Sequence, residues 1–294
     1  MNSKGNPVRL GVDLGGTGTR IVAVNDEHVV LKQMSVPTAG GGDATADLAQ
    51  GLREVADGKT ILMIGIGASG PIDEDGIIRN PDTLPAFTGV DLPTEFGRAL
   101  AAPTYIENDA VTAALYEAEL GAAIDYRSLL MITLGTGVGV SLIIDGRPIR
   151  GADGVHPEAG HLSVCERDAE CYCGRDACWE QVASRTSLER LAARSSNYAL
   201  PVLADHARNG DTSARAIFDE YGRRVAGGLA DLLTIYRPGS VVFGGGGASF
   251  FDLFNRTLRT EVHSRFTFPK PELLVSKAGA YGGAIGATLL DEAS

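Results

Sequence analysis

Apolar and polar positions along the chain form blocks that predict alternating strands and helices. Two apolar runs, beginning at Val12 and Ile132, are each followed by a turn rich in glycine and threonine and then by a second apolar run. The stretches Val12 to Asp26 and Ile132 to Gly146 align without a gap at an offset of 120 residues. Each pattern is typical of a β-hairpin with a glycine tip. The repeat favours a duplicated unit, although two unrelated hairpins with the same turn chemistry would look alike.

The rest of the chain predicts further helices and short strands. We expect helices at 44–56, 91–100, 109–122, 179–193, 213–235, 251–263 and 280–290, and strands at 60–67, 104–106 and 240–243. Strands that alternate with helices predict an α/β fold. A duplicated, hairpin-led unit predicts two lobes with a cleft between them. We expect an N-terminal lobe of residues 1–120 and a C-terminal lobe of residues 121–294, with the last helix able to pack back on the N-terminal lobe.

Composition narrows the classes of partner. The 294 residues are 44% hydrophobic and carry a net charge of −11. An acidic surface repels phosphate backbones, which argues against nucleic-acid binding. No stretch offers the roughly 20 apolar residues of a membrane span, and the polar start leads directly into a strand, unlike a signal peptide. These features predict a cytoplasmic protein with neither nucleic-acid nor membrane partners.

Glycine-rich turns provide candidate phosphate sites. A glycine tip lets successive backbone N–H groups approach an anion, because no Cβ intervenes. No GxxxxGK[ST] loop occurs in the chain, and the first glycines lie between two strands instead of opening a helix, so neither a Walker A nor a Rossmann motif is present. Each turn alone could be an ordinary hairpin, but three such turns favour a nucleotide site. The candidate nucleotide-binding residues are Asp13, Gly15, Gly16, Thr17, Thr136, Gly137, Gly245 and Gly246; Asp13 is able to hold a hydrated Mg²⁺.

A carboxylate follows a predicted strand at the start of a helix. Asn108 and Asp109 open the helix expected at 109–122. Either residue could simply cap that helix. A functional alternative is that Asp109 acts as a general base, because phosphoryl transfer to an alcohol requires an acceptor for the hydroxyl proton. The two interpretations are compatible, since Asn108 can cap the helix while Asp109 faces a ligand.

Three cysteines and a histidine suggest a metal site. His161 precedes the segment CYCGRDACWE, which supplies Cys171, Cys173 and Cys178. One His and three Cys make a tetrahedral zinc site, and a site with four protein ligands is structural because no position remains for water. The cysteines could instead be small buried hydrophobes. Cys165 lies nearby as an alternative ligand or, as we prefer, an unliganded buried thiol.

These motifs resemble a known family. The DLGGT hairpin, the LGTGVG hairpin and VVFGGGG look like the superfamily of acetate kinase, sugar kinases, heat-shock protein 70 and actin, whose two duplicated, ribonuclease H-like lobes clamp MgATP. EAGH at Glu158 to His161, followed by CYCGRDACWE, resembles the ROK signature GExGH with CxCGxxGCxE. The ROK family comprises hexose kinases and sugar-responsive repressors.

The resemblance implies roles for individual residues. Asp109 would be the catalytic base of an ATP-dependent hexose kinase, and His161 would both bind zinc and contact the sugar. Substrate contacts would come from Gly70, Asn108, Asp109, Glu158, His161 and Glu180, and the zinc ligands would be His161, Cys171, Cys173 and Cys178. Glu158 and Glu180 could alternatively be surface or helix-start carboxylates. The family also suggests a homodimer.

Several positions depart from the family pattern, and they leave the sugar open. His156 and Pro157 precede Glu158, Trp179 stands before Glu180, Ala177 replaces a glycine, and Val111 replaces an asparagine. Glucose phosphorylated at O6 is the first choice; mannose, N-acetylmannosamine, N-acetylglucosamine and kanosamine remain open, as does polyphosphate as donor. A sugar-sensing regulator is the alternative without catalysis. Only twelve residues precede Asp13, which leaves little room for the DNA-binding segment of such regulators.

Overall fold

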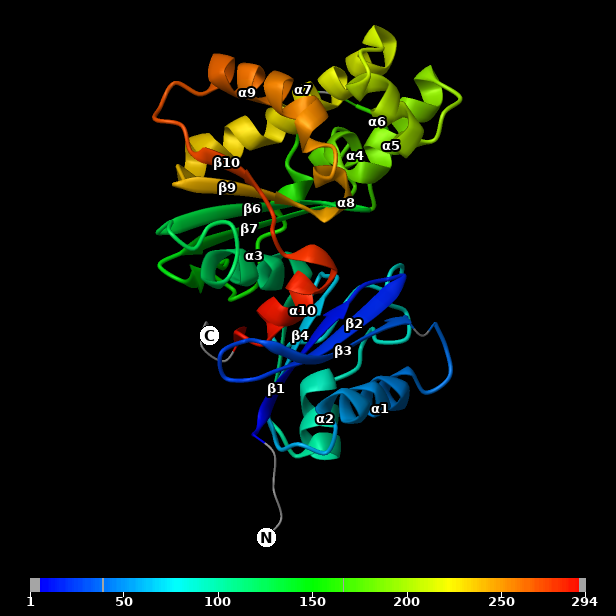
Figure 1. Cartoon of the computed structure of the whole chain (residues 1–294), viewed down its shortest axis with the longest axis vertical. Coiled ribbons are helices and arrows are strands. Elements are labelled where there is room, and N and C mark those ends of the chain that lie inside the picture. Colours follow the sequence, from blue (N-terminus) through cyan, green and yellow to red (C-terminus); the bar gives the residue numbers. More distant parts are fainter. Residues whose placement is uncertain (1–5, 39, 166, 291–294) are drawn as a thin grey trace. The chain divides into compact units, whose positions relative to one another are not determined.

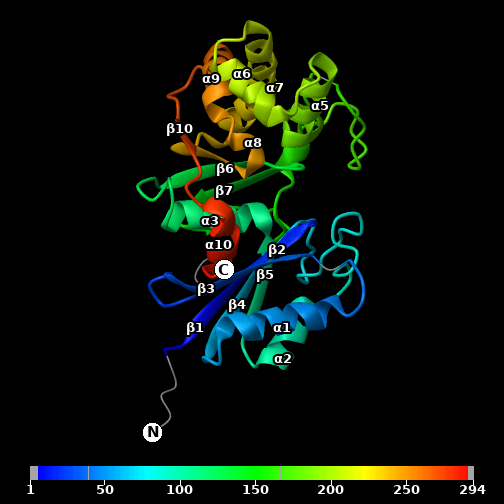
Figure 2. The ribbon, with the colours of Figure 1, turned by 45° about the vertical axis from the view of Figure 1, so that its right-hand side comes forward.

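The computed structural model describes residues 6–38, 40–165 and 167–290. Close contacts divide the chain into two compact units, which can be followed in Figures 1 and 2. The first unit combines residues up to Arg127 with 141–157 and the chain from Lys277 onward, and the second combines 128–140 with 158–276. This division is discontinuous in sequence, in contrast to the two continuous lobes predicted with a boundary near residue 120.

The first unit contains a mixed sheet with the strand order β3-β2-β1-β4-β5. β1 and β2 form the antiparallel hairpin, and β4 and β5 run parallel to β1. Helices α1 and α2 cover one face of this sheet, and α3 and α10 lie on the other (Figure 1). The bounds are β1 Val8–Leu14, β2 Gly18–Val24, β3 Val30–Pro37, α1 Ala44–Ala56, β4 Ile61–Ala68, α2 Leu92–Leu100, β5 Thr104–Asn108, α3 Asp109–Glu119 and α10 Gly282–Ala287.

The register of this sheet brings three strand ends together. Leu14 at the end of β1 pairs with Ala68 at the end of β4, and Ala68 pairs with Asn108 at the end of β5. Because the carboxyl ends of parallel strands meet at one edge, the segments that follow them become neighbours. The predicted phosphate hairpin, the loop at Gly70 and the Asn108–Asp109 turn therefore share one edge of the first unit.

Helix α10 packs unusually closely against this sheet. A Cβ atom at Gly11 of β1 or Gly65 of β4 would overlap backbone oxygens of Ala284 or Ala287, and one at Gly286 would overlap the carbonyl of Thr112 in α3. The backbones can approach this closely only because these positions lack a side chain. The C-terminal helix is thus part of the core of the first unit.

The second unit contributes β9, β10, β6 and the first residues of β7 to a sheet ordered β10-β9-β6-β7-β8. Helices α4 to α7 and α9 gather on one side of β6 and β9 (Figure 1). The bounds are β6 Ser128–Leu134, β7 Val138–Ile144, β8 Arg147–Pro148, α4 Trp179–Ala183, α5 Arg185–Ser195, α6 Leu200–Arg208, α7 Thr212–Tyr236, β9 Ser240–Gly244, α8 Gly245–Ala248, α9 Phe251–Arg265 and β10 Glu272–Val275, with short 3₁₀ turns at Ala159–His161 and Gly279–Tyr281.

Most of the predicted elements are confirmed, including the repeat. β1 and β2 lie at the same offset of 120 residues from β6 and β7 as the two sequence motifs. The single helix predicted at 179–193 is wrong, because the chain breaks at Ser184, whose hydroxyl caps α5 by accepting from the Ser187 backbone N–H at 3.1 Å. Among the described residues, no helix combines the length and apolar character needed to cross a membrane.

Candidate active site

A pair of carboxylates lies at the strand-end edge of the first unit. The hydroxyl of Ser69, just after β4, donates to Oδ2 of Asp109 at 3.0 Å. Loss of solvent around the carboxylate and the negative charge of Asp13 raise the pKa of Asp109 to about 6, against the lowering effect of the Ser69 hydrogen bond. Asp109 can therefore be ionised near neutral pH and still hold a proton with useful affinity, as a general base requires.

Asp13, at the end of β1, has a cationic partner. Arg20 of β2 lies 3.2 Å from its Oδ2. Burial raises the pKa of Asp13, while the charge and hydrogen bond of Arg20 act in the opposite direction. Asp13 and Asp109 are neighbouring carboxylates at one edge of the sheet, and carboxylate oxygens are suitable ligands for a divalent cation such as Mg²⁺.

The first glycine hairpin is fixed by hydrogen bonds at its tip. Gly15 donates its N–H to the carbonyl of Gly18 at 3.2 Å, and the Thr38 hydroxyl donates to the carbonyl of Gly15 at 2.5 Å. A Cβ at Gly16 would lie 2.5 Å from the Thr83 side chain, so a larger residue here would displace Thr83. Gly16 and Thr17 are exposed, which leaves their backbone groups open to a ligand.

Asn108 and Gly70 are held by local contacts. The Asn108 side chain accepts from the Ala110 backbone N–H at 2.8 Å and so caps α3, while Asp109 is the first residue of the helix. The carbonyl of Gly70 accepts from Nδ2 of Asn80 at 2.6 Å. Sequence reasoning did not single out Ser69 or Asn80, although Ser69 lies inside the loop that contains Gly70.

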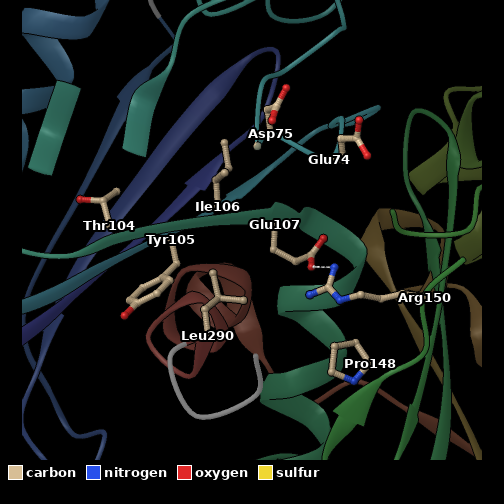
Figure 3. A pocket seen from close by; sticks show the side chains of 10 residues that line it. Glu74, Asp75, Thr104, Tyr105, Ile106, Glu107, Pro148, Arg150 and Leu290 are labelled. Atoms are coloured by element: carbon tan, nitrogen blue, oxygen red, sulfur yellow. Dashed lines mark ion pairs between the residues drawn. The ribbon is translucent and has the colours of Figure 1, made fainter. Parts of the chain in front are cut away.

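A buried ion pair supports the strand that leads to Asp109. Glu107 of β5 is only 5% exposed. One of its carboxylate oxygens lies 2.5 Å from Arg150 Nη1, and the other accepts from the Asn108 backbone N–H at 2.7 Å. Both residues line a cavity of about 250 Å³ beside β5, where Arg150 points at Glu107 (Figure 3). The pair therefore fixes the backbone immediately before the candidate base.

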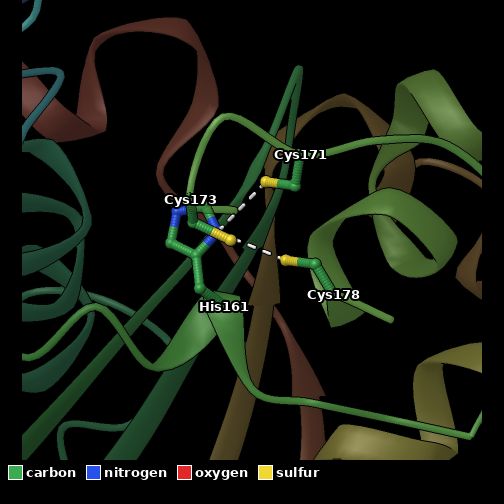
Figure 4. A group of neighbouring side chains, drawn as sticks. All are labelled: His161, Cys171, Cys173 and Cys178. Atoms are coloured by element: carbon green, nitrogen blue, oxygen red, sulfur yellow. Dashed lines mark hydrogen bonds between the residues drawn. The ribbon is translucent and has the colours of Figure 1, made fainter. Parts of the chain in front are cut away.

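The predicted metal ligands converge in the second unit. The ligand atoms of His161, Cys171, Cys173 and Cys178 all lie within 4.8 Å of one another (Figure 4). His161 Nδ1 is 3.3 Å from Cys178 Sγ and 3.5 Å from Cys171 Sγ. A tetrahedral zinc ion with bonds of about 2.0 Å to nitrogen and 2.3 Å to sulfur separates such ligands by about 3.6 Å. The donor set and its spacing therefore fit a tetrahedral metal ion.

Cys165 and His156 stand apart from this cluster. Cys165 is exposed, so the expectation of a buried thiol is wrong; it lies in an irregular segment whose sequence gives no signal for burial. His156, in the first unit, is buried, and burial together with the charge of Arg150 lowers its pKa to about 4. His156 is therefore neutral at physiological pH.

Glu180 contacts the second glycine hairpin. Its Oε2 accepts from the Val138 backbone N–H at 3.1 Å, and a Cβ at Gly137 would overlap this oxygen. Gly137 is thus needed for the carboxylate to reach the hairpin. The preceding Trp179, one of the departures from the family pattern, is completely buried, and its indole occupies the space beside Gly228 that a Cβ would fill.

The remaining predicted residues of the second unit are also described. Thr136 and Glu158 are exposed. Gly245 has a positive φ of 75° and lies against the backbone of Leu134, while Gly246 lies against Arg185. The first unit thus holds Asp13, Gly15, Gly16, Thr17, Gly70, Asn108 and Asp109, and the second holds Thr136, Gly137, Glu158, His161, Cys171, Cys173, Cys178, Glu180, Gly245 and Gly246.

Tyr172 contacts the histidine of the cluster and was not foreseen as a site residue. Its hydroxyl lies 2.8 Å from His161 Nε2, and the two rings meet edge to face with centroids 5.0 Å apart. Burial of the hydroxyl raises the pKa of Tyr172, and the charges of Glu180 and Glu158 raise it further. The hydroxyl thus contacts His161, one of the residues expected to bind a sugar.

Comparison with known proteins identifies the family of this chain. The family model described as the ROK family matches residues 9–293. The chain belongs to the ROK family. A glucokinase of Thermotoga maritima is 32% identical over 86% of this chain and 86% of its own length. An N-acetyl-D-glucosamine kinase of Pectobacterium carotovorum is 31% identical over 95% of this chain and 97% of its own length.

A solved ROK structure has the same fold. The ROK family glucokinase of Streptomyces griseus, in complex with glucose and AMPPNP, superposes with a TM-score of 0.81 at 29% identity, covering 96% of this chain and 98% of that protein. The predicted α/β, actin-like ATPase fold with two lobes is therefore confirmed. The glucokinase and the N-acetyl-D-glucosamine kinase named above have similar sequence identity to this chain, so identity alone does not distinguish between their substrates.

Proposed function

We propose that this ROK protein is an ATP-dependent hexose kinase, with glucose phosphorylated at O6 as its reaction. The observation that carries the proposal is the environment of Asp109: a carboxylate at the start of α3, hydrogen-bonded to Ser69 and with its pKa raised to about 6. The proposal is supported by relatives named as glucokinases and by the complex of one of them with glucose and an ATP analogue.

In the proposed reaction, Asp109 accepts the proton of the sugar hydroxyl as its oxygen bonds to the γ-phosphorus of ATP. The bond from that phosphorus to the bridging oxygen breaks, and ADP leaves. The glycine turns at Gly15–Gly16 and Gly137 would bind phosphate oxygens through backbone N–H groups. Mg²⁺, held through Asp13, would neutralise charge on the phosphates. The further nucleotide contacts in the proposal are Thr17, Thr136, Gly245 and Gly246.

The sugar contacts we propose are Gly70, Asn108, Glu158, His161 and Glu180. We assign the cluster of three cysteines and His161 to a structural Zn²⁺, because its donors match zinc and leave no open position. The zinc would fix the loop that carries Tyr172 and the start of α4 with Glu180. We also propose a homodimer in the cytoplasm.

A coupled ATP-consumption assay across a panel of sugars tests this function. We expect turnover with glucose to exceed that with mannose, N-acetylmannosamine, N-acetylglucosamine and kanosamine. A preference for N-acetylglucosamine, for which the Pectobacterium relative is named, would support the kinase function but show that glucose is not the preferred substrate. No ATP consumption with any sugar, but sugar binding by calorimetry, would instead support a sugar-sensing regulator. Replacing ATP by polyphosphate in the same assay tests the donor.

A further inference from the structure

We propose that, in the free protein, the Tyr172 hydroxyl is hydrogen-bonded to the His161 nitrogen that would contact a sugar. A hexose must displace this hydroxyl in order to bind, so Tyr172 sets the affinity of the protein for sugar. The inference rests on the proposed hexose kinase function. It starts from one contact: the Tyr172 hydroxyl lies 2.8 Å from His161 Nε2. This nitrogen is the ring position that the metal cluster leaves free, because Nδ1 faces Cys178 and Cys171.

The direction of the hydrogen bond follows from the chemistry of the ring. With Nδ1 committed to a metal ion, Nε2 carries the hydrogen and donates it. The Tyr172 hydroxyl is then the acceptor and has its own hydrogen to donate. Glu180 and Glu158 are near enough for their charges to act on this hydroxyl.

This is the arrangement that a sugar hydroxyl would require. A hexose hydroxyl bound at His161 would accept from Nε2, as the Tyr172 hydroxyl does in this structure. One donor cannot serve both hydroxyls at full strength. The tyrosine hydroxyl therefore uses the same donor, His161 Nε2, that a sugar hydroxyl would use. A polyhydroxylated ring can replace this hydrogen bond when it binds.

Displacing the Tyr172 side chain should require little free energy. Although its hydroxyl is screened, the residue is 71% exposed, so its ring has little packing to lose. Its neighbours Cys171 and Cys173 both belong to the metal cluster, and Gly174 donates to the carbonyl of Cys171 at 3.0 Å, so the backbone stays fixed while the side chain rotates. Removing one neutral hydrogen bond should change sugar affinity by roughly 3- to 10-fold.

The test is Tyr172→Phe, which keeps the ring and removes the hydroxyl. We expect KM for the preferred hexose and its dissociation constant from calorimetry to fall by about 3- to 10-fold, with kcat within about twofold of wild type. Tyr198→Phe is the matched control: Tyr198 is also exposed, at 52%, and packs on a histidine, His206, with ring centroids 4.5 Å apart. The control should leave all three constants unchanged.

The outcomes separate this inference from the function on which it rests. If the wild type phosphorylates a hexose, but KM and the dissociation constant are unchanged or higher in Tyr172→Phe, the proposed role of Tyr172 is wrong. The proposed kinase function is then unaffected. A wild type that neither binds nor phosphorylates any hexose would overturn both. Zinc content and thermal midpoint should match wild type in both variants; loss of metal in Tyr172→Phe would mean that Tyr172 serves the cluster and would also overturn the inference.

Discussion

The hydroxyl of Ser69 donates to the carboxylate of Asp109 at 3.0 Å, although the two residues are 40 positions apart in sequence. They meet because β4 and β5 are parallel neighbours that end at the same edge of the sheet. Ser69 stabilises the ionised form of Asp109, whereas desolvation and Asp13 stabilise the protonated form. The balance places the carboxylate in the range where a base is effective at neutral pH.

Replacing Asp109 by asparagine should abolish most turnover but leave sugar binding intact. The amide is nearly isosteric but cannot accept the hydroxyl proton, so we expect kcat to fall by about 10²- to 10⁴-fold. Sugar affinity by calorimetry should change little. Asp125→Asn, the same substitution at an exposed carboxylate, is the control and should retain full activity. Near-normal kcat in Asp109→Asn would remove this residue as the base.

The pH profile should report the same group. Because the base must be ionised, kcat/KM should rise with pH and level off above an apparent pKa of about 6. Ser69→Ala removes a hydrogen bond to the ionised form, so the pKa of Asp109 should rise and the acid limb should move to higher pH by about half to one unit. Steady-state rates between pH 5 and 8 in constant ionic strength would measure the shift. A limb that moves to lower pH would contradict the assignment.

The sequence predicted the parts of the molecule that depend on local chemistry. The repeat at offset 120, helix α1 and the CxCx₄C motif can be recognised from neighbouring residues alone. The structure confirms the hairpin pair and the helix, and it brings the side chains of the three cysteines and His161 together. Asp91 was also expected to open a helix, and it caps α2 by accepting from the Thr94 N–H at 2.9 Å. In these cases the residue types that decide the feature stand close together in the sequence.

Features that depend on distant contacts were missed. Ser69 and Arg150 gain their importance from Asp109 and Glu107, and no local pattern marks either pairing. Tyr172 stands at a variable position of the cysteine motif, so only the folded loop reveals its contact with His161. Strand β3 exposes most of its residues, including the apolar Leu31 and Val36, and its apolar and polar positions do not alternate in the regular way by which strands are recognised.

Purified protein should contain a single zinc ion per chain, held by the cluster. Cys171→Ser and Cys178→Ser should lose the ion and lower the thermal midpoint by at least about 10 °C, because metal binding serves as local folding energy. Cys165→Ser, at the exposed cysteine outside the cluster, is the matched control and should keep both zinc and stability. Elemental analysis with thermal unfolding measures both quantities. Full zinc retention in Cys178→Ser would show that the ligand set is different.

Arg150→Met should destabilise the first unit more than a surface charge replacement does. Glu107 is 5% exposed, and its carboxylate would lose its cationic partner while remaining buried. Breaking a buried pair costs about 3–5 kcal/mol, and we expect about 3 kcal/mol because the Arg150 side chain keeps 36% exposure.

Arg127→Met provides the matched control for this prediction, because it breaks an ion pair with Asp145 in which both side chains are largely exposed. Its urea midpoint should stay close to that of wild type, since exposed pairs contribute little. Double replacement of Glu107 by Gln and Arg150 by Met should recover part of the stability lost in Arg150→Met, since the uncompensated charge is gone. Equal destabilisation by Arg150→Met and Arg127→Met would show that burial of Glu107 does not control the energy of the pair, and with it that the strand before Asp109 is held by other contacts.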